Sequence, residues 1–286
     1  MPIIRVNEAA LYYEEHGTGP ETIVFAHGLL WSCRMFDAQV ALFKERYRCV
    51  AFDFRGQGHS EVTHRGYDME TLYEDAVALI EQLGCAPCHF LGLSMGGFIG
   101  LRLAARRPEL LRSLILLETS ADPEPSEHVA KYRQLTFVAR WLGLGLVVDR
   151  VMPVMFGRTF LTDPARAGER REWRSRMSGN HRLGVTRATT GVITRNGIAG
   201  EIDSIRVPTL ILVGDEDVAV PLVHSQRLHE RIVGSRLQVI PRAGHTSTVE
   251  EPTAVNVTIT TFLGSLSSTH EIEERDEESY NDMPGE

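Results

Sequence analysis

Residues 88–106 read CHFLGLSMGGFIGLRLAAR, an apolar run that leads through a glycine-flanked serine into a segment of helical period. The run Cys88–Leu91 predicts a buried strand, and the apolar spacing after it predicts a helix over Met95–Arg106. Gly92 and Gly96 lie two positions before and after Ser94, where a sharp strand-to-helix turn leaves room only for small residues. The pattern therefore predicts that Ser94 projects its hydroxyl from the tip of such a turn.

On both sides of this turn, short apolar runs alternate with segments of helical period, which is typical of a mostly parallel sheet with helices on both faces. The first two strands are separated by only a few residues, so we expect them to pair antiparallel. The predicted strands are Ile3–Val6, Leu11–Glu15, Thr22–Ala26, Cys49–Phe52, Cys88–Leu91, Ser113–Leu117, Thr209–Val213 and Leu237–Ile240. The predicted helices are Met35–Glu45, Met69–Leu83, Met95–Arg106, Val223–Ile232 and Thr253–Leu266. The predicted fold class is α/β, with an eight-stranded sheet.

The alternation of strands and helices is interrupted once and ends before the C-terminus. Residues 122–200 predict several helices and no clear strand, after which the sheet pattern resumes. We therefore expect a core formed by residues 1–121 and 201–267, with residues 122–200 inserted as a helical cap. Residues 268–286 contain eight acidic residues and one arginine. Such a segment buries too little apolar surface to fold alone, so we expect a disordered acidic tail.

A serine hydroxyl is a weak nucleophile at neutral pH, so catalysis would require a histidine base oriented by a carboxylate. His245 follows a predicted strand near the end of the sheet, at the edge where sites in open α/β sheets form. The acid should follow the strand Thr209–Val213, where the chain reads GDED. We favour Asp217, because it lies beyond the turn and can reach across to His245. Asp215 remains the second candidate, although it suits a turn residue better.

Two backbone amides are candidates for an oxyanion hole beside Ser94. The Met95 N–H lies at the start of the predicted helix, where amides have no partner within the helix. The loop after Thr22–Ala26 reads HGLL, and Gly28 would let it turn so that the Leu29 N–H supplies the second donor. We interpret His27 in this loop as a loop anchor and not as a catalytic residue.

The composition indicates which cellular compartment and which kinds of partner we expect for the protein. The chain carries a net charge of −8, but residues 268–286 account for most of it, so the body is near neutral and lacks a basic surface for nucleic acid. The N-terminal residues show no signal-peptide pattern and no run is long enough to span a bilayer, so we expect a cytoplasmic protein with no membrane partner. We interpret Cys85 and Cys88 as small buried side chains, because a redox pair would open a helix and a zinc site needs more ligands. No metal or organic cofactor is expected.

Together these residues resemble the α/β-hydrolase superfamily over about residues 1–266. Further likenesses are the turn DFRGQGHS at residues 53–60, which the resemblance implies is structural, and Glu250-x-Pro252 after His245. The resemblance implies that Ser94, Asp217 and His245 are the nucleophile, acid and base. Within the superfamily, GLSMGG at 92–97 and RMFDAQ at 34–39 are most similar to 3-oxoadipate enol-lactonases, small esterases and cofactor-free haloperoxidases. A serine at the turn argues against haloalkane dehalogenases and epoxide hydrolases, which use an aspartate there.

The expected function is hydrolysis of a small carboxylic ester or lactone through an acyl-enzyme. One alternative is a lactonase dedicated to an enol-lactone or an acyl-homoserine lactone, and another is a receptor-like member that binds a ligand with little turnover. Trp141, Met155, Phe156 and Phe160 are candidate substrate-binding residues in the cap. Residues 158–195 contain nine arginines against three acidic residues, which either attract an anionic substrate or form a solvated helix face. The sequence leaves the oligomeric state open.

Overall fold

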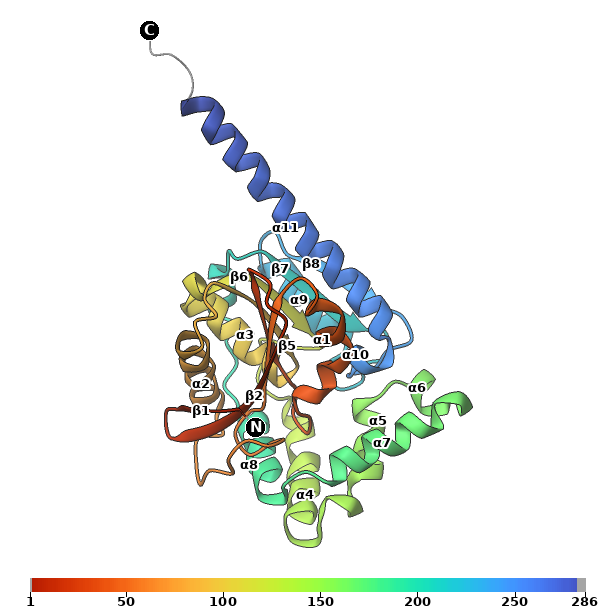
Figure 1. Ribbon diagram of the computed structural model, residues 1–286. Coiled ribbons are helices and arrows are strands. Elements are labelled where there is room, and N and C mark those ends of the chain that lie inside the picture. Colours follow the sequence, from red (N-terminus) through yellow and green to blue (C-terminus); the bar gives the residue numbers. More distant parts are fainter. Residues whose placement is uncertain (1, 282–286) are drawn as a thin grey trace.

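The computed structural model describes residues 2–281, with side chains described as far as residue 266. Its centre is an eight-stranded sheet in the order β1-β2-β4-β3-β5-β6-β7-β8 (Figure 1). β1 pairs antiparallel with β2, β2 pairs antiparallel with β4, and the other neighbouring strands run parallel. The strands are β1 (Ile3–Val6), β2 (Ala9–His16), β3 (Thr22–Ala26), β4 (Arg48–Phe52), β5 (Cys88–Leu93), β6 (Leu111–Leu117), β7 (Thr209–Gly214) and β8 (Arg236–Ile240). The predicted mostly parallel sheet, with its antiparallel start, is confirmed.

Alternate residues along the parallel strands point into two separate hydrophobic cores, as the two-residue period of a strand requires. On β3, Val24 and Ala26 pack in one core, while Ile23 and Phe25 pack in the other. Helices α2, α3 and α9 cover the first core, and α1 and α11 cover the second, so both faces of the sheet are shielded from water (Figure 1). These helices are α1 (Asp37–Phe43), α2 (Met69–Gln82), α3 (Met95–Arg106), α9 (Leu222–Arg231) and α11 (Pro252–Asn281).

Two of the predicted helices are preceded by short helical elements that the sequence analysis did not separate or predict. The helix expected at Met35–Glu45 begins as a 3₁₀ turn, η1 (Cys33–Phe36), and continues as α1. A short helix, α10 (Ser247–Glu250), precedes α11 and carries no apolar period of its own. Boundaries of this kind depend on local hydrogen bonds that the apolar pattern does not encode.

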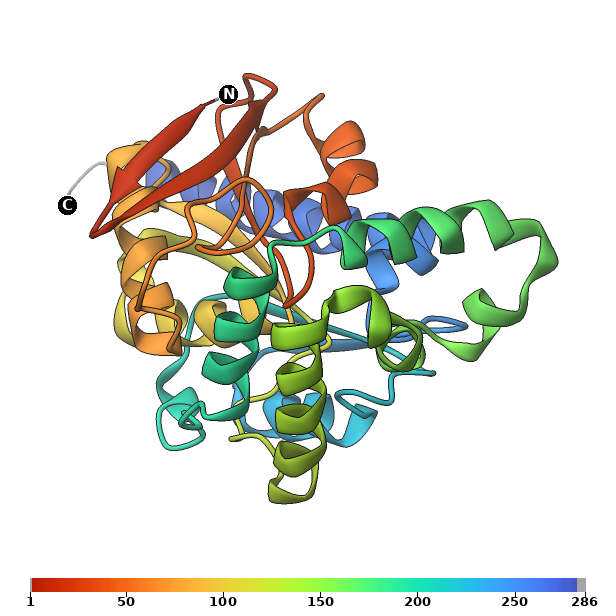
Figure 2. The ribbon, with the colours of Figure 1, turned by 90° about the horizontal axis from the view of Figure 1, so that it is seen from below.

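The segment between β6 and β7 consists of helices and short turns, and no strand is assigned among its residues, all of which the structure describes. α4 and α8 lie below the sheet in Figure 1, and Figure 2, which views the molecule from below, shows them side by side in front of it. The others extend as an arm on one side. The helices are α4 (Ser126–Leu142), α5 (Val148–Met155), α6 (Arg158–Thr162), α7 (Ala167–Ser178) and α8 (Arg182–Ile193). We propose that this segment acts as the cap expected from residues 122–200.

The C-terminal helix α11 is longer than the sequence analysis expected. Its backbone stays helical to Asn281, whereas we expected disorder from residue 268. Residues 268–281 contain neither proline nor glycine and are rich in glutamate, a good helix former, so the helix begun in the core continues past it. The remainder of the expected tail, residues 282–286, lies outside the described residues.

Candidate active site

Ser94 lies at the junction of β5 and α3, in the turn that its flanking glycines predict. Its backbone adopts φ 51° and ψ −108°, a region that costs energy for any residue with a Cβ atom. Two bonds to the end of β6 hold this strained turn: the Ser94 N–H donates to the Leu117 carbonyl at 2.8 Å, and the Thr119 hydroxyl donates to the Ser94 carbonyl at 2.9 Å. The position of Ser94 is therefore fixed from the neighbouring strand.

The two glycines of the turn are required by close backbone contacts. A Cβ on Gly92 would lie 2.3 Å from the Gly96 carbonyl oxygen, and one on Gly96 would lie 2.0 Å from the Ala26 carbonyl oxygen. Real Cβ atoms do not approach oxygen this closely, so neither position tolerates a side chain without moving the backbone. This explains the spacing of glycines seen in the sequence.

The structure brings Ser94, His245 and Asp217 together although they are far apart in the chain. His245 Nε2 lies 2.9 Å from Ser94 Oγ, and His245 Nδ1 lies 2.9 Å from Asp217 Oδ2. All three side chains are at least nine-tenths buried. A carboxylate on Nδ1 favours the tautomer with its proton there, which leaves Nε2 free to accept the serine proton. The arrangement can therefore activate the Ser94 hydroxyl.

The three acidic residues of the loop after β7 have separate partners. Asp217 Oδ1 accepts the Ala219 and Val220 amides at 2.8 and 3.0 Å, which orients its other oxygen toward His245. Asp215 accepts the Arg242 amide at 2.7 Å, so it braces the turn after β8. Glu216 accepts the amide and hydroxyl of Thr159 in the cap. Asp217 is thus the acid placed against the histidine.

The loop after β3 is held by the DFRGQGHS turn. Gln57 accepts the Leu30 amide at 2.7 Å, and Asp53 accepts the Cys33 and His59 amides. Neither the Leu29 nor the Met95 amide has a protein acceptor among the described residues. Both amides thus stay available to a ligand beside Ser94, as the oxyanion-hole expectation requires.

His27 has both ring nitrogens engaged with backbone. Its Nδ1 lies 2.7 Å from the Gly28 carbonyl, and its Nε2 accepts the Phe54 amide at 3.0 Å. Full burial lowers the pKa of His27, which favours the neutral ring that this pattern requires. It anchors the loop, consistent with our interpretation.

Ser94, His245 and Leu29 line a cavity of about 320 Å³ between the strand ends and the helices α4, α5 and α8, which we call the Ser94 cavity. This size falls in the range of small-molecule sites. Most of the wall is apolar and is formed by Leu135, Ala139, Leu144, Val147, Val151, Val154, Met155, Val185, Val192 and Ile193. One end is polar and is formed by Ser120, Glu124, His128, Tyr132, Arg195 and His224.

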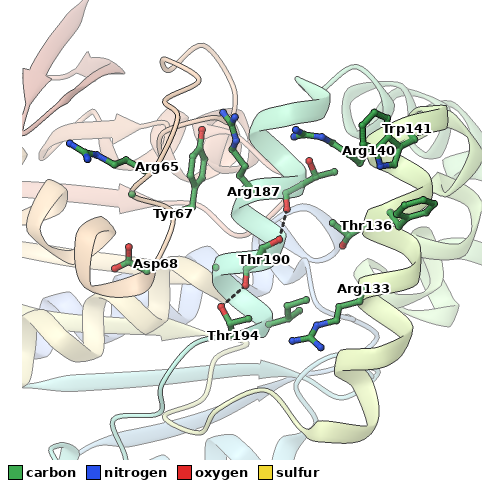
Figure 3. A pocket seen from close by; sticks show the side chains of 15 residues that line it. Arg65, Tyr67, Asp68, Arg133, Thr136, Arg140, Trp141, Arg187, Thr190 and Thr194 are labelled. Carbon is green, nitrogen blue, oxygen red and sulfur yellow. Dashed lines mark hydrogen bonds between the residues drawn. The ribbon is translucent and has the colours of Figure 1, made fainter.

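Of the four cap residues proposed to bind substrate, only Met155 lines the Ser94 cavity. Phe156 and Phe160 stack on each other with centroids 4.5 Å apart inside the second core, away from the cavity. Trp141 is 65% exposed and lies on the outer side of α4, in a different groove (Figure 3). These three assignments were wrong, because aromatic residues at helical spacing do not reveal which face of a cap helix meets the core.

The arginines of residues 158–195 largely lie outside the Ser94 cavity. Only Arg195 lines it, and its guanidinium donates to Glu124 at 2.7 Å and lies 4.2 Å above the Phe98 ring. Others pair at the surface, as Arg174 does with Asp149 at 2.7 Å. The Ser94 cavity therefore offers a substrate only Arg195, whose charge is already compensated by Glu124. The other arginines of residues 158–195 are better described as a solvated helix face.

Two buried carboxyl groups lie near Asp217: sequence reasoning missed Glu118, and it noted Glu250 only as part of a motif. Glu118 directly follows β6 with φ 44°, and its side chain is fully buried. Burial, with the charge of Asp217 second, raises the pKa of Glu118 well above its usual range. The one signal in the sequence is that Glu118 directly follows the predicted strand Ser113–Leu117, the next predicted strand after the one that leads to Ser94.

Glu250, the acid of the Glu250-x-Pro252 motif, joins the base loop to the cap. Its carboxylate accepts the Gly157 amide at 2.7 Å and the Thr246 amide at 3.1 Å. Burial raises the pKa of Glu250 to about 7. The Thr246 hydroxyl also donates to the Met155 carbonyl at 2.7 Å, so the residue next to His245 is attached to the cap as well.

The cysteines and the other potential metal ligands are the remaining candidate groups. No group of three or more His, Cys, Asp or Glu side chains there is placed to hold a metal ion. Cys85 and Cys88 are buried free thiols, and burial raises the pKa of both. None of the described helices is long and apolar enough to cross a bilayer.

Comparison with known proteins agrees with this geometry. The model of the alpha/beta hydrolase family matches residues 23–257, and the chain belongs to this family. It is 26% identical to 3-oxoadipate enol-lactonase 2 of Acinetobacter baylyi, over 88% of this chain and 92% of that protein. Among solved structures, it is similar to the enol-lactonase of Burkholderia xenovorans, with a TM-score of 0.86, 27% identity and coverage of 92% and 100% of the two chains. It is also similar to a thermophilic esterase of Thermogutta terrifontis, with a TM-score of 0.85, 26% identity and coverage of 93% and 99%.

Proposed function

We propose that this hydrolase cleaves small carboxylic esters or lactones through an acyl-enzyme formed on Ser94. The hydrogen-bonded series Ser94–His245–Asp217, which opens on a largely apolar cavity, carries the proposal. The esterase and enol-lactonases to which the chain is similar act on carbonyl compounds of this kind, as their names state. The fold alone would not support a reaction, since many functions share it.

The proposed reaction begins with attack of Ser94 Oγ on the substrate carbonyl carbon, as the hydroxyl proton passes to His245 Nε2. The carbonyl oxygen becomes an oxyanion that the Leu29 and Met95 amides stabilise. Collapse breaks the bond to the alkoxy oxygen, which leaves as an alcohol with the proton from His245. A water molecule then gives a proton to His245 and attacks the acyl carbon, which releases the acid and restores Ser94. Asp217 stabilises the imidazolium in both halves.

The test is turnover of p-nitrophenyl acetate by the Ser94→Ala variant. We expect kcat to fall by about 10⁴-fold to 10⁶-fold, with residual rate from the oxyanion hole and binding. Ser225→Ala, which removes a buried hydroxyl on α9 without a protein partner among the described residues, serves as the matched control. Near-native turnover by Ser94→Ala would refute the assignment of the nucleophile. A single burst of product without further turnover would favour the receptor-like alternative.

The cavity also predicts which substrates are preferred. A carboxylate in the substrate would meet Glu124, and Arg195 is already paired with that residue, so burying the added charge is unfavourable. We expect diethyl adipate to be cleaved about tenfold or more faster in kcat/KM than monoethyl adipate. A preference for the monoester would indicate that Arg195 leaves Glu124 to bind anionic substrates. A parallel set of enol-lactones and acyl-homoserine lactones would separate lactonase from esterase activity.

A further inference from the structure

The end of α4 exposes an unusual concentration of large apolar side chains. Phe137 is 66% exposed and Trp141 is 65% exposed, and Leu142 and Leu146 just beyond them are exposed to the same degree. Scattered exposed apolar residues are normal on a folded protein, but a contiguous group marks a surface that is covered by something. These four residues fall within one short segment of the chain, so they form a group by sequence alone.

Arginines accompany the aromatic residues on one side of α4. Arg133, Phe137, Arg140 and Trp141 follow the three- and four-residue spacing of one helix face, and they line a groove of about 650 Å³ together with Arg187 of α8. Figure 3 shows this groove, which we call the cap groove, between α4, α8 and the loop that carries Arg65. Cationic and apolar side chains thus occupy the same surface.

The charge of the cap groove has little compensation. Arg133 and Arg140 have no acidic partner among the described residues, and Arg187 donates only to the Thr63 carbonyl. Arg65 is the groove arginine that has an acidic partner, Glu8 at 2.8 Å. The acidic residue in the lining, Asp68, caps α2 by accepting from Thr71. The chain has more acidic than basic residues overall, yet residues 130–148 contain three cations and no acid. The surface is therefore locally positive on a negatively charged protein.

We propose that the cap groove and the exposed end of α4 form a docking surface for an anionic lipid bilayer, which departs from the expectation of no membrane partner drawn from the sequence. Such a bilayer offers negative head groups above apolar chains, which matches arginines interspersed with Trp and Phe side chains. Long arginine side chains reach head groups while neighbouring aromatic rings enter the interface. A second copy docked through the same face about a two-fold axis would bring arginines against arginines, which is unfavourable.

The position of the acidic C-terminal segment favours the same orientation. The far end of α11 and α4 lie at opposite ends of the molecule (Figure 1), so the backbone of residues 268–281, a stretch with six acidic residues and one arginine, runs away from the docking surface. Thr136, Thr186 and Ile193 line both the cap groove and the Ser94 cavity. In a docked molecule, the wall of the Ser94 cavity that these residues form would therefore lie next to the lipid surface.

The test is sedimentation of the full chain with vesicles of phosphatidylcholine alone and of an equimolar mixture with phosphatidylglycerol. We expect binding to the mixed vesicles, weak or no binding to phosphatidylcholine, and release as salt is raised. Phe137→Ser with Trp141→Ser should weaken binding about tenfold or more. Arg133→Gln and Arg140→Gln should each weaken it about fivefold.

Matched controls replace equally exposed residues elsewhere. Val233→Ser with Val257→Ser removes exposed apolar side chains outside α4, and Arg5→Gln removes an exposed arginine on β1. These variants should bind mixed vesicles like the unmodified chain, and turnover of p-nitrophenyl acetate would check that every variant is folded. Equal binding to both vesicle types, no binding, or equal losses in the controls would overturn the proposal. A dimer in sedimentation velocity that Phe137→Ser with Trp141→Ser dissociates would also overturn it, because a second copy would then cover the face.

Discussion

The loops at the strand ends and the helices of the cap are built on different principles. Ser94, Asp217 and His245 each follow a strand or its turn, and backbone hydrogen bonds fix the nucleophile and the acid. In the cap, by contrast, side-chain packing decides which residues face the Ser94 cavity, and aromatic residues at similar spacing are either buried or about two-thirds exposed. The comparison indicates that short local patterns specify the positions of the proposed reacting groups, whereas the wall of the Ser94 cavity depends on contacts between distant segments.

The largest effect is expected at the strand-end loops, where the roles of Asp217 and Asp215 can be tested separately. Asp217→Asn should lower kcat by about 10⁴-fold, because the amide can no longer hold the His245 proton on Nδ1. Asp215→Asn leaves the triad intact and should change kcat little, since Asp215 braces the Arg242 turn. Steady-state kinetics with p-nitrophenyl acetate measures both. Equal losses in the two variants would show that the loop acts as one unit.

The cap side is tested by filling the Ser94 cavity. Val154→Phe adds a ring to its apolar wall and should lower kcat/KM for p-nitrophenyl octanoate about tenfold or more, with a smaller effect on the acetate. Val257→Phe makes the same change on an exposed position of α11 and serves as its control. A uniform loss across chain lengths would mean that Val154 does not border the acyl site.

The smallest expected effect concerns Glu118, whose buried carboxyl group lies near Asp217. Because its pKa is raised in the folded protein, Glu118 retains its proton there while the unfolded chain has already lost it. The stability that this proton supports is fully present below the unfolded pKa of about 4.5 and is lost progressively as the pH rises above it. Glu118→Gln removes that dependence.

Thermal or urea unfolding of both proteins at pH 5 and pH 8 measures the difference. Relative to the unmodified chain, Glu118→Gln should gain more than about 1 kcal/mol in unfolding free energy between these conditions, since one pKa unit corresponds to about 1.4 kcal/mol. Parallel pH dependence in both proteins would show that Glu118 ionises normally.

The sequence predicted most of the fold because each strand of the parallel sheet is an apolar run bounded by turn residues. Ile3–Val6, Thr22–Ala26 and the helix Met95–Arg106 agree with the structure to the residue. The triad geometry could be anticipated as well, since parallel strand ends meet at one edge of a sheet. Such patterns are local, so one sequence suffices to find them.

The cap and the buried carboxyl groups could not be predicted in the same way. Phe156 and Trp141 have similar apolar character, yet one lies in the core and the other in the cap groove, because tertiary packing chooses the face. Glu118 reads as an ordinary polar residue after β6, and only the arrangement of β5 and β7 on either side of β6 shows that it is buried. The helical continuation of α11 depended on a core that an acidic composition does not reveal.

The attachment of Gly157 and Thr159 to Glu250 and Glu216 has a consequence for engineering this enzyme. A Cβ on Gly244 would lie 2.2 Å from the Gly157 nitrogen, so the two backbones meet without room for side chains. A chimera whose cap comes from a relative must therefore keep this junction together. Residues 155–159 should be exchanged only along with compatible residues at positions 216, 244 and 250. Exchanges of cap segments that leave residues 155–159 and their partners unchanged are the better starting points for altering substrate selectivity.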